Sequence, residues 1–260
     1  MLCYNVMNMI IYEQPLNEII RLCLRVEYLF RQVKHHLEVD TEWDSRVALG
    51  ALLEILSVID RPDLKSKLGQ MLNQYVATFV QLEKVEKVDH KILKVTLDRL
   101  HKAINIVHSN QSRIGQELRE NEFLLSILQK HFTPAGTCPF NAPAYHLWLQ
   151  QPANLRLKTL SLWLETLFPL YRIVELILQL TRDSASSEKH IAHGGFYQTN
   201  LDPTIFYQMI SIEISEKERL YPEISVGRYR LTVHFFELST KDRAHQTAHD
   251  VSFGLKCCKI

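Results

Sequence analysis

Histidines and cysteines are the residues of this chain best suited to hold a metal ion. The chain contains twelve histidines and five cysteines, and both residue types ligate zinc. The most suggestive groups are His190 with His193, His245 with His249, and Cys257 with Cys258. Their spacing matches no common zinc module, and neutral or surface histidines are the simpler explanation. We therefore expect no metal and no other cofactor, and keep a metal-dependent enzyme as an alternative.

A thiol nucleophile activated by a base is the second possible chemistry. Cys138 and His146 are suitable residue types, but Cys138 precedes Pro139 in a turn, and no residue is identifiable that would orient the pair. His146 is more simply a packed helix residue, and we keep it only as a binding candidate. The chain also lacks a glycine-rich phosphate loop, a dinucleotide fingerprint, a nucleophile elbow and a His-Glu-x-x-His helix. These patterns favour a protein that is not an enzyme, with a thiol enzyme as the alternative.

Arginines form the third group of interest. Arg21 and Arg25 are four residues apart and share one helical face, while Arg113 and Arg119 lie in a second basic stretch. Such charges are usually a solvated helix face, because neighbours such as Glu27 can pair with them. The helical arginines are therefore candidates for binding an acidic partner, with a solvated surface as the simpler reading.

A strand is predicted from residue 228 to residue 235, because apolar and polar residues alternate there. Tyr229, Leu231, Val233 and Phe235 are expected to face the core. Arg228, Arg230 and His234 are then expected on the opposite face, where like charges repel unless an acidic neighbour or ligand compensates. This predicted strip is the most informative cationic feature of the sequence.

The composition sets the class of protein. Thirty Lys and Arg residues balance 29 Asp and Glu residues, so no charge excess points to nucleic acid or to an anionic membrane. The longest apolar runs are interrupted and shorter than the roughly 20 residues of a membrane span. We see no secretory signal, and the cysteines are too few and scattered for a secreted disulfide framework. We therefore expect a cytoplasmic protein with reduced thiols and no membrane insertion.

The elements that must position these residues fall into two classes. Between about Pro15 and Asp183 the apolar residues recur with helical spacing, and Thr41, Pro62 and Asp89 mark helix starts, while Pro169 predicts an interruption. Further helical pieces are expected over residues 111–120, 123–132, 144–150 and from 155 onward, on either side of a loop over residues 133–143. Consecutive amphipathic segments with short joints predict a helical bundle.

The spacing of apolar residues changes to two after a predicted linker over residues 184–202. Strands are expected around residues 210–214, 229–235 and 251–257, and the run over residues 6–12 is a plausible fourth. The sequence therefore predicts an α-plus-β protein with a smaller antiparallel sheet that the amino-terminal strand joins. The predicted domains are 14–184, and 1–13 plus 195–260.

Several segments in order resemble the ZapD family of cell-division proteins. The similar segments run through nearly the whole chain and occupy residues 15–18, 24–27, 113–120, 146–149, 195–198 and 220–225. The resemblance implies a helical domain that dimerises, a β domain, and binding of the carboxy-terminal tail of the tubulin-like protein FtsZ. It further implies bundling of FtsZ filaments and stabilisation of the Z-ring at the mid-cell division site.

The resemblance also implies tail-binding residues. The family's basic positions correspond to Arg25, Arg61, Arg119, Arg228 and Arg230, and the patterns above add Arg113, His146 and His234. The implied partners are FtsZ and a second copy of the chain, with no nucleic acid.

Overall fold

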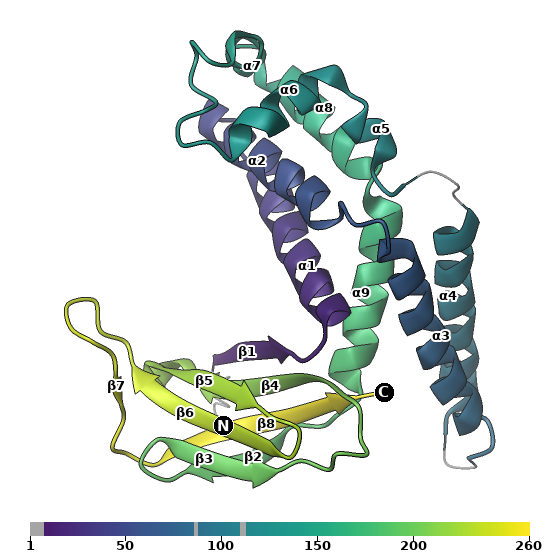
Figure 1. Cartoon of the computed structure of the whole chain (residues 1–260), viewed down its shortest axis with the longest axis vertical. Coiled ribbons are helices and arrows are strands. Elements are labelled where there is room, and N and C mark those ends of the chain that lie inside the picture. Colours follow the sequence, from purple (N-terminus) through teal and green to yellow (C-terminus); the bar gives the residue numbers. More distant parts are fainter. Residues whose placement is uncertain (1–7, 86–87, 110–112) are drawn as a thin grey trace, which may run out of the picture. The chain divides into compact units, whose positions relative to one another are not determined.

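The computed structural model describes residues 8–85, 88–109 and 113–260, which fall into a helical unit and a sheet unit (Figure 1). The helical unit comprises Leu22–Leu178, and the sheet unit comprises the residues up to Arg21 together with Gln179–Ile260. The α-plus-β class is confirmed, and an amino-terminal strand does join the carboxy-terminal sheet. The domain boundaries inferred from the sequence remain a prediction.

Nine α-helices occur in the described ranges. They are α1 (Glu18–Leu37), α2 (Glu42–Val58), α3 (Leu64–Leu82), α4 (His90–Ser109), α5 (Gln116–Arg119), α6 (Glu122–His131), α7 (Pro143–Leu149), α8 (Ala153–Glu165) and α9 (Phe168–Asp183). The break at Pro169 is confirmed, because α8 ends before it and Pro169 lies in the first turn of α9, where no amide donor is needed. The helix predicted over residues 111–120 is reduced to the four residues of α5, and Gln111 lies outside the described residues.

Two of the three predicted helix starts are confirmed, whereas Pro62 precedes Asp63, the N-cap residue of α3, and so lies outside the first turn of that helix. The hydroxyl oxygen of Thr41 accepts the backbone N–H of Asp44 at 3.1 Å, which satisfies one of the free donors of α2. The carboxylate of Asp89 does the same for the amides of Lys91 and Ile92 at the start of α4. The polar residues chosen from the sequence therefore set where α2 and α4 begin.

The helical unit buries one apolar stripe of each long helix. Phe30 of α1 stacks on Tyr171 of α9 with ring centroids 4.5 Å apart. Helices α3 and α4 pair as an antiparallel hairpin (Figure 1), and they bury residues such as Leu72 and Leu100. The apolar periodicity seen in the sequence thus becomes the contact surface between helices.

Two antiparallel sheets form the sheet unit. The strands are β1 (Met9–Pro15), β2 (Glu188–Ala192), β3 (Phe196–Asn200), β4 (Tyr207–Ser215), β5 (Leu220–Val226), β6 (Arg230–Glu237), β7 (His245–Gln246) and β8 (Val251–Lys259). One sheet has the order β1-β4-β8-β2, and the other has the order β3-β6-β5 with β7 paired to β6. Alternate residues of both sheets, such as Ile212, Val233 and Phe253, share one buried core. A sandwich therefore hides the apolar faces that the sequence predicted.

The linker predicted over residues 184–202 is wrong for most of its length, because β2 and β3 lie within it. Both are edge strands, and β2 carries charged residues of the kind that protect an edge from aggregation, which conceals its periodicity. The turn between them uses Gly194 and Gly195 with positive φ angles of 55° and 72°. A Cβ on Gly195 would lie 2.7 Å from the carbonyl oxygen of Thr247, so glycine is required there.

Strand β5 is a further element that the sequence analysis missed. It contains Pro222, which lacks the amide donor of a central strand, but β5 lies at the edge of its sheet, where this is tolerated. The amino-terminal strand is confirmed from Met9 onward, whereas Val6 and Met7 lie outside the described residues.

Candidate functional site

Three of the arginines singled out from the sequence converge at the carboxy-terminal end of α2. Arg61, Arg113 and Arg119 all line one small pocket of about 30 Å³, together with Asp60 and Lys65. Arg61 follows the end of α2, and Arg113 and Arg119 lie on either side of a turn at Gly115, which has a φ of +74°. We call Arg61, Lys65, Arg113 and Arg119 the cationic cluster.

Arg119 is the most firmly held member of the cationic cluster. Its guanidinium lies 2.9 Å from a carboxylate oxygen of Asp60 and donates to the carbonyl oxygen of Leu56 at 3.0 Å. Burial lowers the pKa of Arg119, nearby Arg113 adds to that effect, and Asp60 opposes it. Its buried Nε atom has no hydrogen-bond partner among the described residues. Arg119 therefore helps to hold α5 against α2 as well as contributing charge.

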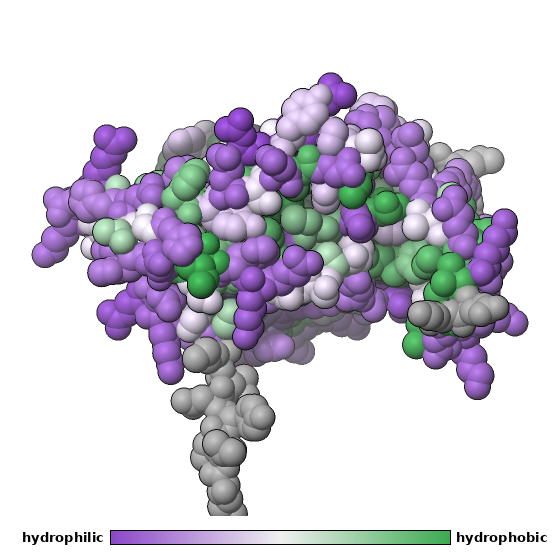
Figure 2. All heavy atoms as spheres, turned by 90° about the horizontal axis from the view of Figure 1, so that it is seen from below, coloured by the Kyte–Doolittle hydropathy of each residue, from purple (hydrophilic) through white to green (hydrophobic). Residues whose placement is uncertain are grey.

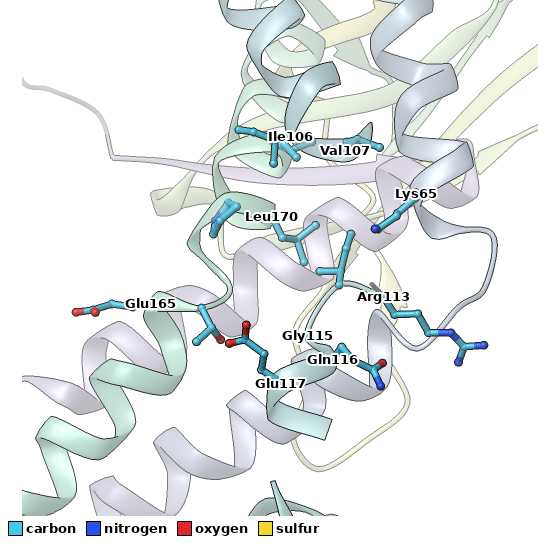
Figure 3. A pocket seen from close by; sticks show the side chains of 13 residues that line it. Lys65, Ile106, Val107, Arg113, Gly115, Gln116, Glu117, Glu165 and Leu170 are labelled. Atoms are coloured by element: carbon cyan, nitrogen blue, oxygen red, sulfur yellow. The ribbon is translucent and has the colours of Figure 1, made fainter. Parts of the chain in front are cut away.

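Two larger hollows adjoin the cationic cluster, because Arg113 lines all three. One, of about 330 Å³, lies between α2, α5 and α6, and it includes Arg119 and Glu120. The other, of about 260 Å³, lies between α3, α4, α5 and α9, and we call it the α9 cavity. Figure 3 shows Lys65 and Glu117 pointing toward the α9 cavity, whereas Arg113 and Glu165 point away from it. The cluster is thus bordered by surfaces that could receive a bound chain.

Lys65 and Glu117 were missed in the sequence analysis. Lys65 follows Arg61 by four residues, and that spacing of two cations is the signal that could have drawn attention to it. Glu117 lies between Arg113 and Arg119 in sequence, and nothing in the pattern distinguishes it from a solvated acidic residue.

The structure does not bring the other helical candidates into this cluster. Arg25 is exposed on α1 and lines none of these hollows. His146 lies on α7, where its neighbour Tyr145 packs near Arg46 in the first turns of α2, with 5.3 Å from guanidinium carbon to ring centroid. Leu56, which Arg119 contacts, is about 15 Å further along α2 at 1.5 Å per residue. The buried Nδ1 atom of His146 has no hydrogen-bond partner among the described residues.

The cationic strip predicted on the sheet is shorter than expected. Arg228 is not on a strand, because it lies in the loop between β5 and β6 with Tyr229, whose ring centroid is 5.3 Å from its guanidinium carbon. Tyr229 is 57% exposed, so the prediction that it faces the core is wrong. A tight hairpin between β5 and β6 interrupts the predicted alternation of apolar and polar residues here. Arg230 is exposed at the start of β6.

His234 lies on the same outward side of β6 as Arg230, but it is half-buried. Its ring lies 4.9 Å from that of Phe196 between centroids, and its Nδ1 atom is 3.0 Å from the amide oxygen of Gln246. Glu223 is its partner on β5. The cationic part of the outward face is therefore limited to Arg230 and the neighbouring hairpin residue Arg228, with His234 packed among aromatic and polar side chains.

Several of the residues considered for metal or thiol chemistry have other partners. Across the described ranges, no three His, Cys, Asp or Glu side chains gather in a way that could hold a metal ion. His193 pairs with Asp250 at 2.9 Å, and the Nδ1 atom of His190 is 3.2 Å from the hydroxyl of Tyr197. The thiol of Cys138 accepts a hydrogen bond from the amide of Asn141 at 3.4 Å. An amide cannot act as the base that a thiol nucleophile requires.

The helices and the visible surface lack the features of a membrane-spanning segment in the part of the chain that the structure describes. Within residues 8–85, 88–109 and 113–260, no helix has the length and apolar character needed to cross a membrane. The face drawn in Figure 2 is mostly hydrophilic, and its hydrophobic residues lie in small separate groups. Exposed hydrophobic residues of this kind are ordinary on a protein surface.

Comparison with known proteins gives one consistent result. Residues 24–234 match the family model described as "ZapD: Cell division protein". The chain is 43% identical to the cell division protein ZapD of Coxiella burnetii over 253 residues, which cover 96% of this chain and 98% of the relative. It is 35% identical to the protein of the same name from Methylococcus capsulatus, over 97% of this chain and 99% of the relative. With the corresponding protein of Aromatoleum aromaticum the identity is 33%, over 96% and 97% of the two chains.

Proposed function

The chain belongs to the ZapD family of cell-division proteins, and from that premise we propose that it binds the carboxy-terminal tail of FtsZ and cross-links FtsZ filaments. By this proposal it acts in the cytoplasm at mid-cell and promotes assembly and stability of the Z-ring. The observation that carries the proposal is the convergence of Arg61, Arg113 and Arg119, because clustered guanidinium groups bind carboxylates with paired hydrogen bonds.

Direct binding of the tail is the first test of this proposal. A fluorescently labelled peptide with the sequence of the FtsZ tail should show a saturable rise in anisotropy when the protein is added. A peptide of the same composition in scrambled order is the control, since non-specific attraction of charge would be unchanged. Equal binding of both peptides would mean that the protein does not recognise the tail.

Cross-linking requires two binding surfaces, and we propose that a homodimer formed through the helical part, residues 14–184, supplies them. The first helix supports this because Tyr28 is 68% exposed beside half-buried Leu24, which leaves apolar surface outside the core. Light scattering should give about twice the chain mass of 30.4 kDa. A stable monomer at micromolar concentration would remove this route to cross-linking.

Bundling of filaments is expected to weaken as salt rises. Exposed arginines that meet acidic groups are screened, with a Debye length of about 8 Å at physiological ionic strength. Turbidity or electron microscopy of FtsZ filaments over a salt series would measure the effect, with the filaments alone as control. Bundling that is undiminished at several hundred millimolar salt would show that the arginines are only a solvated surface.

A thiol or metal-dependent enzyme remains the alternative, and alkylation separates the two functions. Burial raises the pKa of the Cys23 thiol to about 12 and that of Cys258 to about 11, so both are protonated and unreactive near neutral pH. We expect iodoacetamide to modify half-exposed Cys138 before buried Cys23 and Cys258, as read by peptide mass spectrometry, while tail binding is unchanged. Stoichiometric metal in the purified protein, or an activity that is lost in step with modification of a cysteine, would favour the enzyme alternative.

A further inference from the structure

Apolar side chains form one part of the lining of the α9 cavity, whose size suits one large side chain. Its volume of about 260 Å³ lies among the side chains of Ile106, Val107, Ile114, Leu170 and Ile173. A single water needs only about 10–15 Å³ of such space, so the cavity has room for a bulky side chain. Removing an apolar side chain from water into such a site favours binding.

The mouth of the α9 cavity carries opposite charges on opposite sides. Lys65 of α3 and Glu117 of α5 both point toward the cavity, with Leu170 of α9 between them (Figure 3). Glu117 is exposed and Lys65 is half-buried, so both are within reach of a bound chain. A ligand that fills the cavity therefore meets a cation on one side and a carboxylate on the other.

The occupant is indicated by continuity with the cationic cluster. Arg113 lines the α9 cavity as well as the pocket that contains Arg61 and Arg119. A chain held at the cluster by its carboxylates can therefore extend to the mouth of the cavity. A small molecule would fill the cavity alone, whereas an extended peptide would use both surfaces.

We infer that the α9 cavity receives a bulky apolar side chain of the bound FtsZ tail, from a segment that places an acidic residue toward Lys65 and a basic residue toward Glu117. This inference rests on the proposed function and adds to it the kind of peptide segment that is recognised. It also assigns a binding role to an acidic residue, Glu117, which lines the cavity together with Glu165 and the cations Lys65 and Arg113.

Reversing the charge of Glu117 tests whether this side of the cavity mouth contacts a basic residue of the tail. If the tail binds only through its negative charge, Glu117→Lys must strengthen binding. If Glu117 contacts a basic residue, the same substitution weakens binding, by about two- to fivefold in Kd for an exposed charge pair. Titrations with the labelled tail peptide should be run at about 0.15 M salt, where distant charges are screened.

Glu120→Lys is the matched control for this charge. Glu120 is three residues further on and lines the hollow beside Arg119 and Arg113, not the α9 cavity. Glu120→Lys changes the charge by the same amount as Glu117→Lys. Because Glu120 lies beside Arg113 and Arg119, its replacement should strengthen binding of the acidic tail by about two- to fivefold. The two substitutions are therefore expected to change Kd in opposite directions.

Filling the cavity tests its occupant. Ile106 of α4 is 37% exposed and lines the cavity, so Ile106→Trp should fold normally and raise the Kd for the tail peptide about tenfold or more by excluding the apolar side chain. Val95→Trp is the control, because Val95 is on the same helix, is 59% exposed and lies outside the cavity. Its Kd and thermal unfolding should match those of the unsubstituted protein.

The outcomes separate failure of the proposed function from failure of the inference about the cavity. If the unsubstituted protein does not bind the tail peptide, the proposed function itself fails. If it binds, but Glu117→Lys and Glu120→Lys both strengthen binding, or Ile106→Trp binds normally, the cavity is not occupied by the tail. The cationic cluster would then bind the tail without the cavity.

Discussion

Replacing both Arg61 and Arg113 with Glu is expected to raise the Kd for the FtsZ tail by about a hundredfold or more. Each substitution removes a charged hydrogen-bond donor, a contribution of about 1.5–3 kcal/mol, and introduces a repelling carboxylate. Arg119 is left unchanged because it also contacts Asp60 and the carbonyl oxygen of Leu56. Its replacement would lower the stability of the fold as well as the affinity for the tail, and the two effects would not be separable. The measurement is peptide anisotropy, with thermal unfolding to confirm the fold.

Lys91→Glu with Lys94→Glu is the matched control for this double reversal. Both lysines are exposed on α4 in the same unit, and neither lines the hollows around the cationic cluster. The change of net charge is the same, so a specific site should leave this control with nearly normal binding. Equal loss in both variants would show that the tail responds only to overall charge.

Replacing Arg228 and Arg230 with Glu is expected to abolish tail binding while the fold and the dimer stay intact. Both side chains are exposed at the start of β6 and its hairpin, so the substitutions remove no core contact. Replacing two guanidinium groups that contact the tail with carboxylates should again raise the Kd for the tail peptide by about a hundredfold or more. Anisotropy measures binding, and light scattering with circular dichroism checks the dimer and the fold.

The control for the hairpin is Lys241→Glu with Arg243→Glu. These residues are exposed in the loop between β6 and β7 of the same sheet unit, and the substitutions impose the same charge change. Normal binding by the Arg228 and Arg230 variant would mean that the sheet is not part of the site. The arginines of the helical unit would then account for tail binding without it.

Helices α2 and α4 could be predicted well because their starts have a local chemical signal. Thr41 and Asp89 both accept backbone amides at helix starts, as their positions in the sequence suggested. The missed strands lack such signals, since charged residues on β2 and Pro222 in β5 are features of edge strands that resemble a loop. Whether a strand lies at the edge of a sheet depends on how distant segments pair, and the spacing of apolar residues does not show this.

The candidate site could be predicted only in part. Resemblance to a family drew attention to Arg61 and Arg119, but their meeting with Arg113 depends on how α2, α3 and α5 pack. The strip on β6 was overestimated because alternation was extended through Arg228 into a hairpin loop. Spacing along a chain reports which face a residue takes, whereas the tight turns and helix contacts that bring faces together are set by the whole fold.

Sedimentation with FtsZ filaments tests whether the protein binds and cross-links them through the FtsZ tail. Filaments of full-length FtsZ and of FtsZ without its carboxy-terminal tail should be compared at equal filament mass and salt. We expect the protein to pellet in bundles with full-length FtsZ and to stay in the supernatant with tailless FtsZ. Equal pelleting with both kinds of filament, or with neither, would contradict this expectation.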